Sequence, residues 1–408
     1  MTARRAGGLA LAGGALAAAL VGVCVWAAWA QRAPLVPADA GRAEGEGAWL
    51  GVFLGALIGA FAAYAVALWL LRRACVRLSA VAAVAVAVQL LPLAAPLLLS
   101  TDAWTYWEYG AIASEGGNPY ADTPQDFPRN PAFEHAGADW RDTTSVYGPA
   151  FTLLSEGVAR ASGSSEDAAA WTFKTIAALS MLAVTALAAL LARERALAAA
   201  FVGWNPLLAV HFAGGGHNDA LMLALVLGAL ALASRGRRSA AAVAWVLSIL
   251  VKWVSAIFFA LRAIDARASH RPVAHVGFAV AAVLAAAVAT WRYGLEWVRA
   301  FVPLARNAEE RTSYAVPHRL EQLGLPEELA LALVGIGLVA GLALLVRRAQ
   351  AGRPCLGRAG CLLLLTTPWL APWYAVWAVP LAATEEDPPA QVAALALCAY
   401  LLPQTVPV

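Results

Sequence analysis

Residues 100–120 read STDAWTYWEYGAIASEGGNPY, and the interpretation of the whole chain starts from them. A hydrophobic run over residues 81–99, long enough to cross a bilayer, leads into this stretch. Asp102 therefore stands where the chain should leave the lipid, and on a helix Tyr106 and Tyr109 share its face. An acid at a membrane exit with aromatic rings beside it predicts a lipid-facing active site. The simpler alternative is that the acid and the two hydroxyl residues before it only cap an interfacial helix.

The composition is that of a membrane protein. Of the 408 residues, 61% are hydrophobic and 13% are charged, and the mean hydropathy is +0.66. These values exclude a soluble enzyme and predict an all-α, polytopic transmembrane bundle of about 10–11 helices, forming a single domain over residues 1–408. The net charge of +3 is small and sits in short loops, so nucleic acid is not an expected partner. None of the five cysteines lies in a predicted external loop, so we expect no disulfide.

Hydrophobic runs and arginine positions together predict the topology. The N-terminal run ends at bulky tryptophans rather than at a clear cleavage site, so it is interpreted as a retained helix and not as a signal peptide. Arginines should lie on the cytoplasmic side. The expected spans are residues 1–30, 48–71, 79–99, 168–192, 196–213, 220–234, 273–291, 329–346, 359–382 and 389–406.

Two polar regions and one unusual apolar segment complete this topology. Residues 100–167 are expected to form a large external loop of short interfacial helices, because residues 100–148 carry eight acids and only two arginines. Residues 292–328 are expected to form a second external loop. Residues 239–261 are expected to be re-entrant, with Lys252 near the tip, because this keeps the arginines of 262–271 and 347–358 inside.

His217-Asn218-Asp219 follows three glycines at a predicted membrane exit. Glycine lets a ligand approach the backbone closely, and His and Asp can orient a sugar, bind a metal or assist proton transfer. The alternative is a helix boundary with ordinary capping residues. We therefore expect His217, Asn218 and Asp219 to be binding residues of a functional site.

Lys252 is one of only two lysines beside 27 arginines, and it lies in an apolar segment. A charge at the centre of a membrane helix costs roughly 2.5–3.5 kcal/mol, so such a residue is a functional candidate, with a phosphate as its partner. The alternative is a lysine whose stem extends to the membrane surface.

Four further residues are weaker binding candidates. Tyr147 lies in a turn signal, and Arg319 is a loop arginine that is otherwise solvated. Trp373 and Tyr374 suit stacking on a sugar or a lipid, although an interfacial aromatic belt is the commoner explanation.

Taken together, these motifs resemble the GT-C superfamily of integral-membrane glycosyltransferases. They are most similar to the polyprenyl-phosphate-mannose-dependent α-mannosyltransferases of actinobacterial cell envelopes. The resemblance covers about residues 80–382 and rests on the order of its motifs. The tandem aspartates common in some GT-C enzymes are absent, since Asp102 follows a threonine. The matching motifs are Ser100-Thr101-Asp102 with Tyr106 and Gly110, Gly117-Asn118-Pro119-Tyr120, Tyr147-Gly148-Pro149, Trp204-Asn205-Pro206, Gly216-His217-Asn218-Asp219, Leu250-Val251-Lys252-Trp253 and Pro372-Trp373-Tyr374.

The resemblance implies an inverting sugar transfer, most simply of mannose, from a polyprenyl phosphate to a cell-envelope glycan or glycolipid. Asp102 would be the general base, and Lys252 with Arg319 would stabilise the leaving phosphate. His217 and Asp219 would orient the donor or the acceptor. The other expected donor- or acceptor-binding residues are Tyr106, Tyr147, Asn218, Trp373 and Tyr374. The reaction would take place at the outer face of the plasma membrane, in a multi-pass protein in the lipid bilayer. No cofactor is required, although a divalent metal held by Asp102, His217 and Asp219 stays an open alternative. Two other functions also stay open, a lipid-linked sugar flippase and an envelope-polymer glycosyltransferase with a pentose donor.

Overall fold

The computed structural model describes residues 2–30, 47–271, 275–307 and 312–405, and in these ranges the regular structure is helical, with no strand. Five helices are long and apolar enough to cross a membrane: α1 (Ala3–Ala30), α2 (Gly47–Leu71), α6 (Glu166–Leu191), α12 (His275–Tyr293) and α15 (Glu327–Gln350). Shorter apolar helices accompany them: α3 with η1 (Leu78–Ala94), α9 (Asp219–Ser234), α10 (Arg238–Val251), α16 (Leu356–Thr366) and α18 (Pro388–Leu401). The prediction of an all-α membrane bundle is confirmed.

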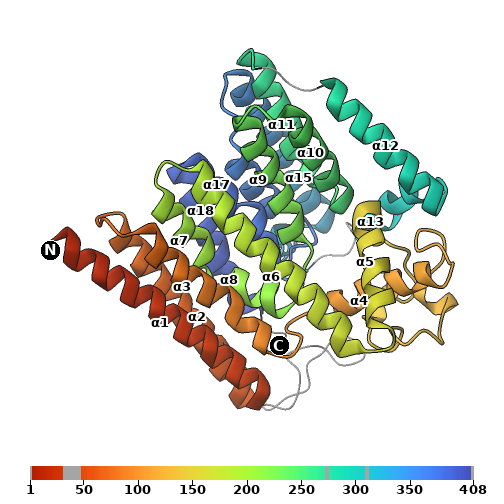
Figure 1. Cartoon of the computed structure of the whole chain (residues 1–408), viewed down its shortest axis with the longest axis horizontal. Helices are drawn as coiled ribbons and strands as arrows, with labels where there is room; N and C mark the ends of the chain where they lie inside the picture. Colours follow the sequence, from red (N-terminus) through yellow and green to blue (C-terminus); the bar gives the residue numbers. More distant parts are fainter. Residues whose placement is uncertain (1, 31–46, 272–274, 308–311, 406–408) are drawn as a thin grey trace.

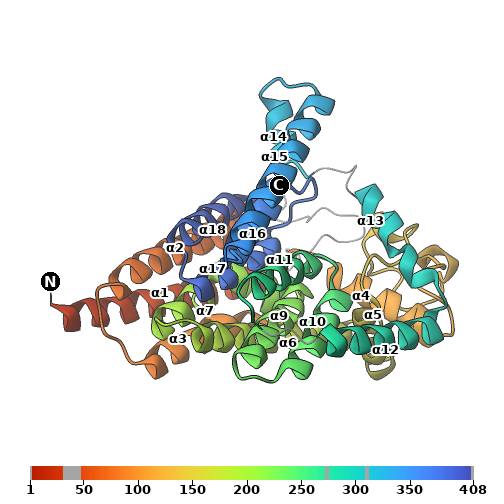
Figure 2. The ribbon, with the colours of Figure 1, turned by 90° about the horizontal axis from the view of Figure 1, so that it is seen from above.

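The helices are arranged around α6 (Figure 1). On one side α1 packs along α2 and α3, and on the other α9 and α10 lie together. Helices α12 and α15 lie at the periphery and expose rows of apolar side chains, including Val280, Val283 and Ile336, as expected for helices that face lipid. Figure 2 shows α14 (Val316–Gln322) and the adjoining part of α15 standing away from the other helices.

A sixth span is broken at Trp204-Asn205-Pro206. Helix α7 (Arg195–Gly203) stops there, and the chain restarts as α8 (Pro206–Ala209) and the π-helix η4 (Val210–Gly214) at an angle of 52°. Proline cannot continue the α7 hydrogen-bond ladder, and the Asn205 side-chain oxygen accepts hydrogen bonds from the next two backbone N–H groups. After the break, η4 packs against α6 and η1.

Residues 238–268 form a helical hairpin, here called the first hairpin. Helix α10 ends at Val251, and α11 (Ser255–Ala268) runs back along it. The hydroxyls of Ser248 and Ser255 lie 3.1 Å apart, and the rings of Trp245 and Phe259 lie 5.6 Å apart. The prediction that the chain turns back here, with Lys252 at the tip, is confirmed.

Residues 356–385 form a second hairpin, and here the sequence-based prediction was wrong. Residues 359–382 were expected to span the membrane once. Instead, α16 leads to the short helix η6 (Pro372–Trp377), and α17 (Val379–Glu385) returns to the same end. The Glu385 carboxylate accepts hydrogen bonds from the backbone N–H groups of Leu356 and Gly357, at 2.7 and 2.9 Å. Prolines at 368 and 372 break the helix, so a segment of spanning length folds back on itself.

Both hairpins begin and end at the arginine-rich end of the bundle. The last turns of α11 and α15 meet there, since a Cβ on Gly352 would lie 3.1 Å from the Ser269 hydroxyl. The tips of both hairpins therefore point to the opposite end.

Residues 100–167 fold into short helices at that opposite end: α4 (Asp102–Ser114), η2 (Pro124–Asp126), η3 (Ala138–Trp140) and α5 (Pro149–Ser162). Helices α4 and α5 pack so closely that a Cβ on Gly110 would overlap the Ser155 carbonyl. Arg292, near the end of α12, pairs with Glu156 of α5 at 3.1 Å. The last short helices are η5 (Glu296–Ala300), α13 (Phe301–Asn307) and η7 (Pro403–Thr405).

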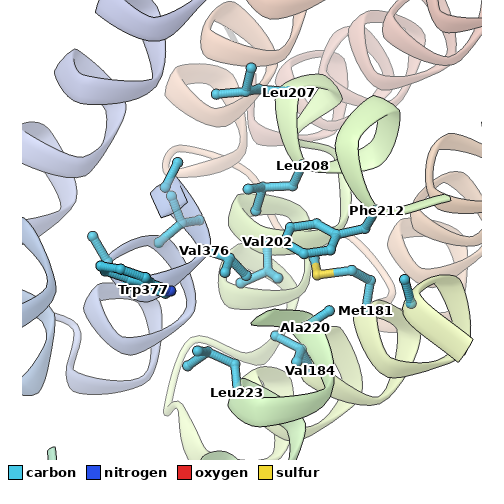
Figure 3. Close-up of a cluster of buried hydrophobic side chains, with 14 of the residues drawn as sticks. Met181, Val184, Val202, Leu207, Leu208, Phe212, Ala220, Leu223, Val376 and Trp377 are labelled. Carbon is cyan, nitrogen blue, oxygen red and sulfur yellow. The ribbon is translucent and has the colours of Figure 1, made fainter. Parts of the chain in front are cut away.

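An apolar core underlies the hairpin tips. Figure 3 shows Phe212, Ala220 and Val376 packed with Met181 and Val202, so segments distant in sequence share one cluster. This core fixes the relative positions of η4, α9 and η6, which carry the polar groups described next.

Candidate active site

A cavity of about 620 Å³ opens where the two hairpin tips meet the start of α4. Asp102 and Tyr147 line one side, Lys252 comes from the first hairpin, and Trp373 and Tyr374 come from the second. Five of the residues singled out from the sequence, distant in the chain, are thus brought around one space.

The Asp102 side chain does not act as a helix cap. Its Oδ2 accepts a hydrogen bond from the Tyr106 hydroxyl at 3.1 Å and lies 3.0 Å from Nδ1 of His217. Thr101 occupies the N-cap position and its side chain accepts no hydrogen bond from the helix backbone, whereas the Ser100 hydroxyl accepts one from the Asp102 N–H at 3.1 Å. The carboxylate is 16% exposed, so it is within reach of a molecule in the cavity.

The pKa of Asp102 reflects opposing influences. Burial alone would raise it, but the hydrogen bond and charge of His217, together with the charge of Lys252, lower the pKa of this carboxyl below its ordinary value of 3.8. Asp102 is therefore an ionised hydrogen-bond acceptor at neutral pH.

His217 is fixed from three sides. Trp373 stacks on its ring with centroids 3.7 Å apart and planes 12° apart. The preceding Gly216 has a φ of +76°, and a Cβ on Gly215 would lie 3.0 Å from His217 Nε2. The glycines of this motif thus allow the close approach that holds the imidazole against Asp102.

The Lys252 ammonium is held by side chains at the start of α9. Its Nζ lies 2.7 Å from Oδ2 of Asp219 and 3.4 Å from the side-chain oxygen of Asn218. The other Asp219 oxygen accepts a 2.6 Å hydrogen bond from Trp377 Nε1. Asp219 is fully buried, whereas Lys252 is 18% exposed, so the cation faces the cavity and the anion lies behind it.

Arg319 is not brought to the cavity. Its guanidinium donates to the Tyr400 hydroxyl and to the Gln322 side chain, at 3.0 and 2.7 Å. Tyr400 in turn donates to the backbone of Tyr314, which lines the cavity. Arg319 therefore supports the cavity wall through Tyr400.

Sequence reasoning missed three residues. His211 lines the cavity and is 1% exposed, and neither ring nitrogen has a partner among the described residues. Trp377 orients Asp219. Lys174 is buried in α6 and donates to the carbonyl oxygens of Leu93 and Ala95, which precede Asp102. His211 had one available signal, as a lone titratable residue in an apolar run.

The described residues contain no group of three or more His, Cys, Asp or Glu side chains placed to hold one metal ion. Asp102 and His217 contact each other directly, and Asp219 is occupied by Lys252 and Trp377. The three side chains considered as a metal set are thus engaged in two separate pairs.

Comparison with known proteins places the chain among glycosyltransferases. A family model described as "Alpha-(1->6)-mannopyranosyltransferase, N-terminal domain" matches residues 5–268, which are 264 of the 408 residues. This match includes Asp102, His217 and Lys252 and ends before the second hairpin. No solved structure matches the chain.

Curated relatives carry the same name. "Alpha-(1->6)-mannopyranosyltransferase A" of Mycobacterium tuberculosis is 32% identical over 228 residues, covering 50% of this chain and 44% of the relative. Its namesake in Corynebacterium glutamicum is 29% identical over 169 residues, covering 40% and 34%. The matched regions span less than half of either relative. Because the family model covers well over half of this chain, the protein belongs to the family described as alpha-(1->6)-mannopyranosyltransferases.

Proposed function

We propose that this protein transfers mannose from a polyprenyl-phosphate donor to a hydroxyl of a cell-envelope glycan or glycolipid, with inversion at the anomeric carbon. One observation carries the proposal: an ionised acid, Asp102, and a cation, Lys252, line the same cavity. Inverting transfer from a phosphate leaving group needs one base and one group that stabilises the departing anion. Family membership supports mannose as the sugar.

In the proposed reaction the acceptor hydroxyl lies against Asp102. Its oxygen forms the new bond to the anomeric carbon while its proton passes to the Asp102 carboxylate. The bond between the anomeric carbon and the phosphate oxygen breaks, and its electron pair leaves with the polyprenyl phosphate. The ammonium of Lys252 stabilises the charge that develops on that phosphate.

The neighbouring side chains orient these groups. His217 and Tyr106 fix the Asp102 carboxylate, and Asp219 fixes Lys252. His211 lies at the cavity wall, and its two ring nitrogens, which have no partner among the described residues, would form hydrogen bonds with sugar hydroxyls. Tyr147 and Tyr374 provide aromatic surface for the sugar or the first isoprene unit.

The proposal places the cavity at the outer face of the plasma membrane. The arginines of residues 235–238, 262–271 and 347–358 gather at the opposite end of the bundle, which the positive-inside tendency assigns to the cytoplasm. The lipid tail of the donor would then remain in the bilayer while its head group enters the cavity from the side.

The test is transfer of radiolabelled mannose from polyprenyl-phosphate-mannose in membranes that contain the chain or its Asp102→Asn variant at equal levels. We expect transfer by the parent and a loss of at least about 100-fold in the variant, the lower end for a general base. Asp142→Asn is the matched control, because this exposed acid belongs to the same segment and its side chain forms a hydrogen bond only with the neighbouring Thr143 among the described residues.

Equal rates for the parent and Asp102→Asn would remove Asp102 from the chemistry. If the parent transfers no mannose but does transfer a pentose from a polyprenyl phosphate, the proposed mannose donor is wrong and the donor is the pentose-linked lipid. Loss of transfer with a chelator would establish a metal requirement.

A further inference from the structure

A second cavity, of about 590 Å³, lies at the base of the first hairpin. It is formed where the start of α10 meets the end of α11, beside the turn that follows α9 and the first turn of α12. We call it the hairpin-base pocket. Helix α10 has 14 residues, which correspond to roughly 20 Å, so this pocket lies at the opposite end of the hairpin from Lys252.

Three arginines line the hairpin-base pocket: Arg238, Arg262 and Arg271. Behind them Asp265 is fully buried and pairs with Arg262 and, at 3.7 Å, with Arg271. Three positive charges thus face one negative charge, and an excess positive charge remains. The Arg238 backbone N–H donates to the Gly236 carbonyl, but its guanidinium forms no hydrogen bond or ion pair with another described residue and is available to an outside anion.

The remaining wall of this pocket is apolar. Ten of its fifteen lining residues are Leu, Ala, Trp or Phe. Phe259 of α11 stacks on Phe278 of α12 with ring centroids 4.3 Å apart, and Trp245 lies beside them. The guanidinium groups can bind a phosphate, and the aromatic wall can contact a hydrocarbon chain. The pocket therefore suits a molecule that carries both groups.

We propose that the hairpin-base pocket binds an anionic phospholipid, with the phosphate on Arg238, Arg262 and Arg271 and an acyl chain along Phe259 and Phe278. A soluble anion would make no contact with the apolar wall. A zwitterionic lipid would be attracted less strongly by the excess positive charge. The site is separate from the cavity of the proposed transfer reaction and does not depend on it. The bound phospholipid would stabilise the base of the first hairpin, whose tip carries Lys252.

The test uses the purified full chain in detergent with equal amounts of phosphatidylglycerol and phosphatidylcholine, and native mass spectrometry to measure which lipid stays bound. We expect the parent to retain phosphatidylglycerol preferentially. Arg238→Gln should weaken this retention about fivefold, which corresponds to about 1 kcal/mol for one basic side chain near an anionic lipid.

Arg237→Gln is the matched control. It removes the same charge from the adjacent residue, also at the start of α10, but Arg237 does not line the pocket. Neither substitution removes a side-chain cap from α10, so both variants should fold. Retention of phosphatidylglycerol by Arg237→Gln with loss in Arg238→Gln supports the site. Equal losses in the two variants, or equal retention of both lipids by the parent, would overturn it. A third arm adds glycerol 3-phosphate, and displacement of the lipid by this head group alone would identify a soluble phosphate as the ligand instead.

Discussion

The ammonium of Lys252 lies 2.7 Å from a carboxylate oxygen of Asp219, and the other oxygen of Asp219 accepts a hydrogen bond from Trp377. One buried carboxylate thereby joins the tip of the first hairpin to the end of η6 in the second. Each hairpin places one wall of the cavity, so this pair of contacts sets the shape of the site as well as the position of its cation.

The two partners of the Lys252–Asp219 pair differ in burial, so we expect their single variants to lose different amounts of stability. Lys252→Met leaves the fully buried Asp219 without its counter-ion, whereas Asp219→Asn leaves a lysine that is 18% exposed. Removing one partner of a buried pair typically costs about 3–5 kcal/mol. We therefore expect Lys252→Met to lower the thermal unfolding temperature in detergent more than Asp219→Asn does. The double variant should recover part of the loss, and equal, additive effects would contradict this account.

Lys252 also has a predicted chemical role. Lys252→Met should lower the rate of sugar transfer by about 100-fold to 1,000-fold, as expected when one group that stabilises developing charge is removed. Lys252→Arg keeps the charge and should keep more of the rate, although a planar guanidinium fits the space between Asp219 and Tyr374 less well. Single-turnover assays at saturating donor separate this effect from binding. Equal rates for Met and Arg variants would show that charge at this position does not assist transfer.

The Asp102–His217 contact predicts a shift in the pH profile. Burial raises the pKa of Asp102, but the hydrogen bond and charge of His217 bring it below the ordinary value of a carboxyl, so the base stays ionised to lower pH than a free aspartate would. His217→Gln removes the charge while burial continues to raise the pKa. The acid limb of the transfer rate should therefore move to higher pH, and an unchanged limb would assign it to another group.

His211 predicts opposite effects on stability and on substrate binding. Its two buried ring nitrogens have no hydrogen-bond partner among the described residues, and each such group costs about 1–3 kcal/mol. His211→Leu should therefore unfold at the same or a higher temperature than the parent. If these nitrogens bind sugar hydroxyls, the same variant should raise KM about tenfold, a loss of about 1.4 kcal/mol. A lower unfolding temperature with unchanged KM would make His211 a structural residue only.

Position 148 requires a residue without a Cβ for steric reasons alone. A Cβ at this position would overlap the Leu250 carbonyl, where the chain enters α5 against the first hairpin. Gly148→Ala should therefore lower the yield of folded protein, measured by size-exclusion chromatography of detergent extracts.

Gly157→Ala provides the control on the same helix. Beyond its own helix backbone, no atom of the described residues lies within 4 Å of a Cβ there, and replacing a glycine inside a helix by alanine stabilises it by up to about 1 kcal/mol. A normal yield of Gly148→Ala would show that the two segments can separate without cost.

The sequence by itself determined the class of the protein and many of its site residues. Long apolar runs allow only helices in lipid, because every backbone polar group must be satisfied within its own segment. Asp102 and Lys252 were identifiable because a charged side chain at a membrane segment is costly and needs a reason. Glycines before His217 signalled a close approach that the structure contains.

Only the tertiary structure decided which polar residues meet and which helices turn back. Hydropathy measures the length of an apolar segment but not whether a break within it lets the chain continue or reverse, so residues 359–382 were wrongly predicted to form one span. Whether Arg319 reaches the cavity, and whether His211 lies at its wall, depends on packing between segments far apart in sequence. Such contacts are set by the joint fit of η4, α9 and η6, and no local pattern records them.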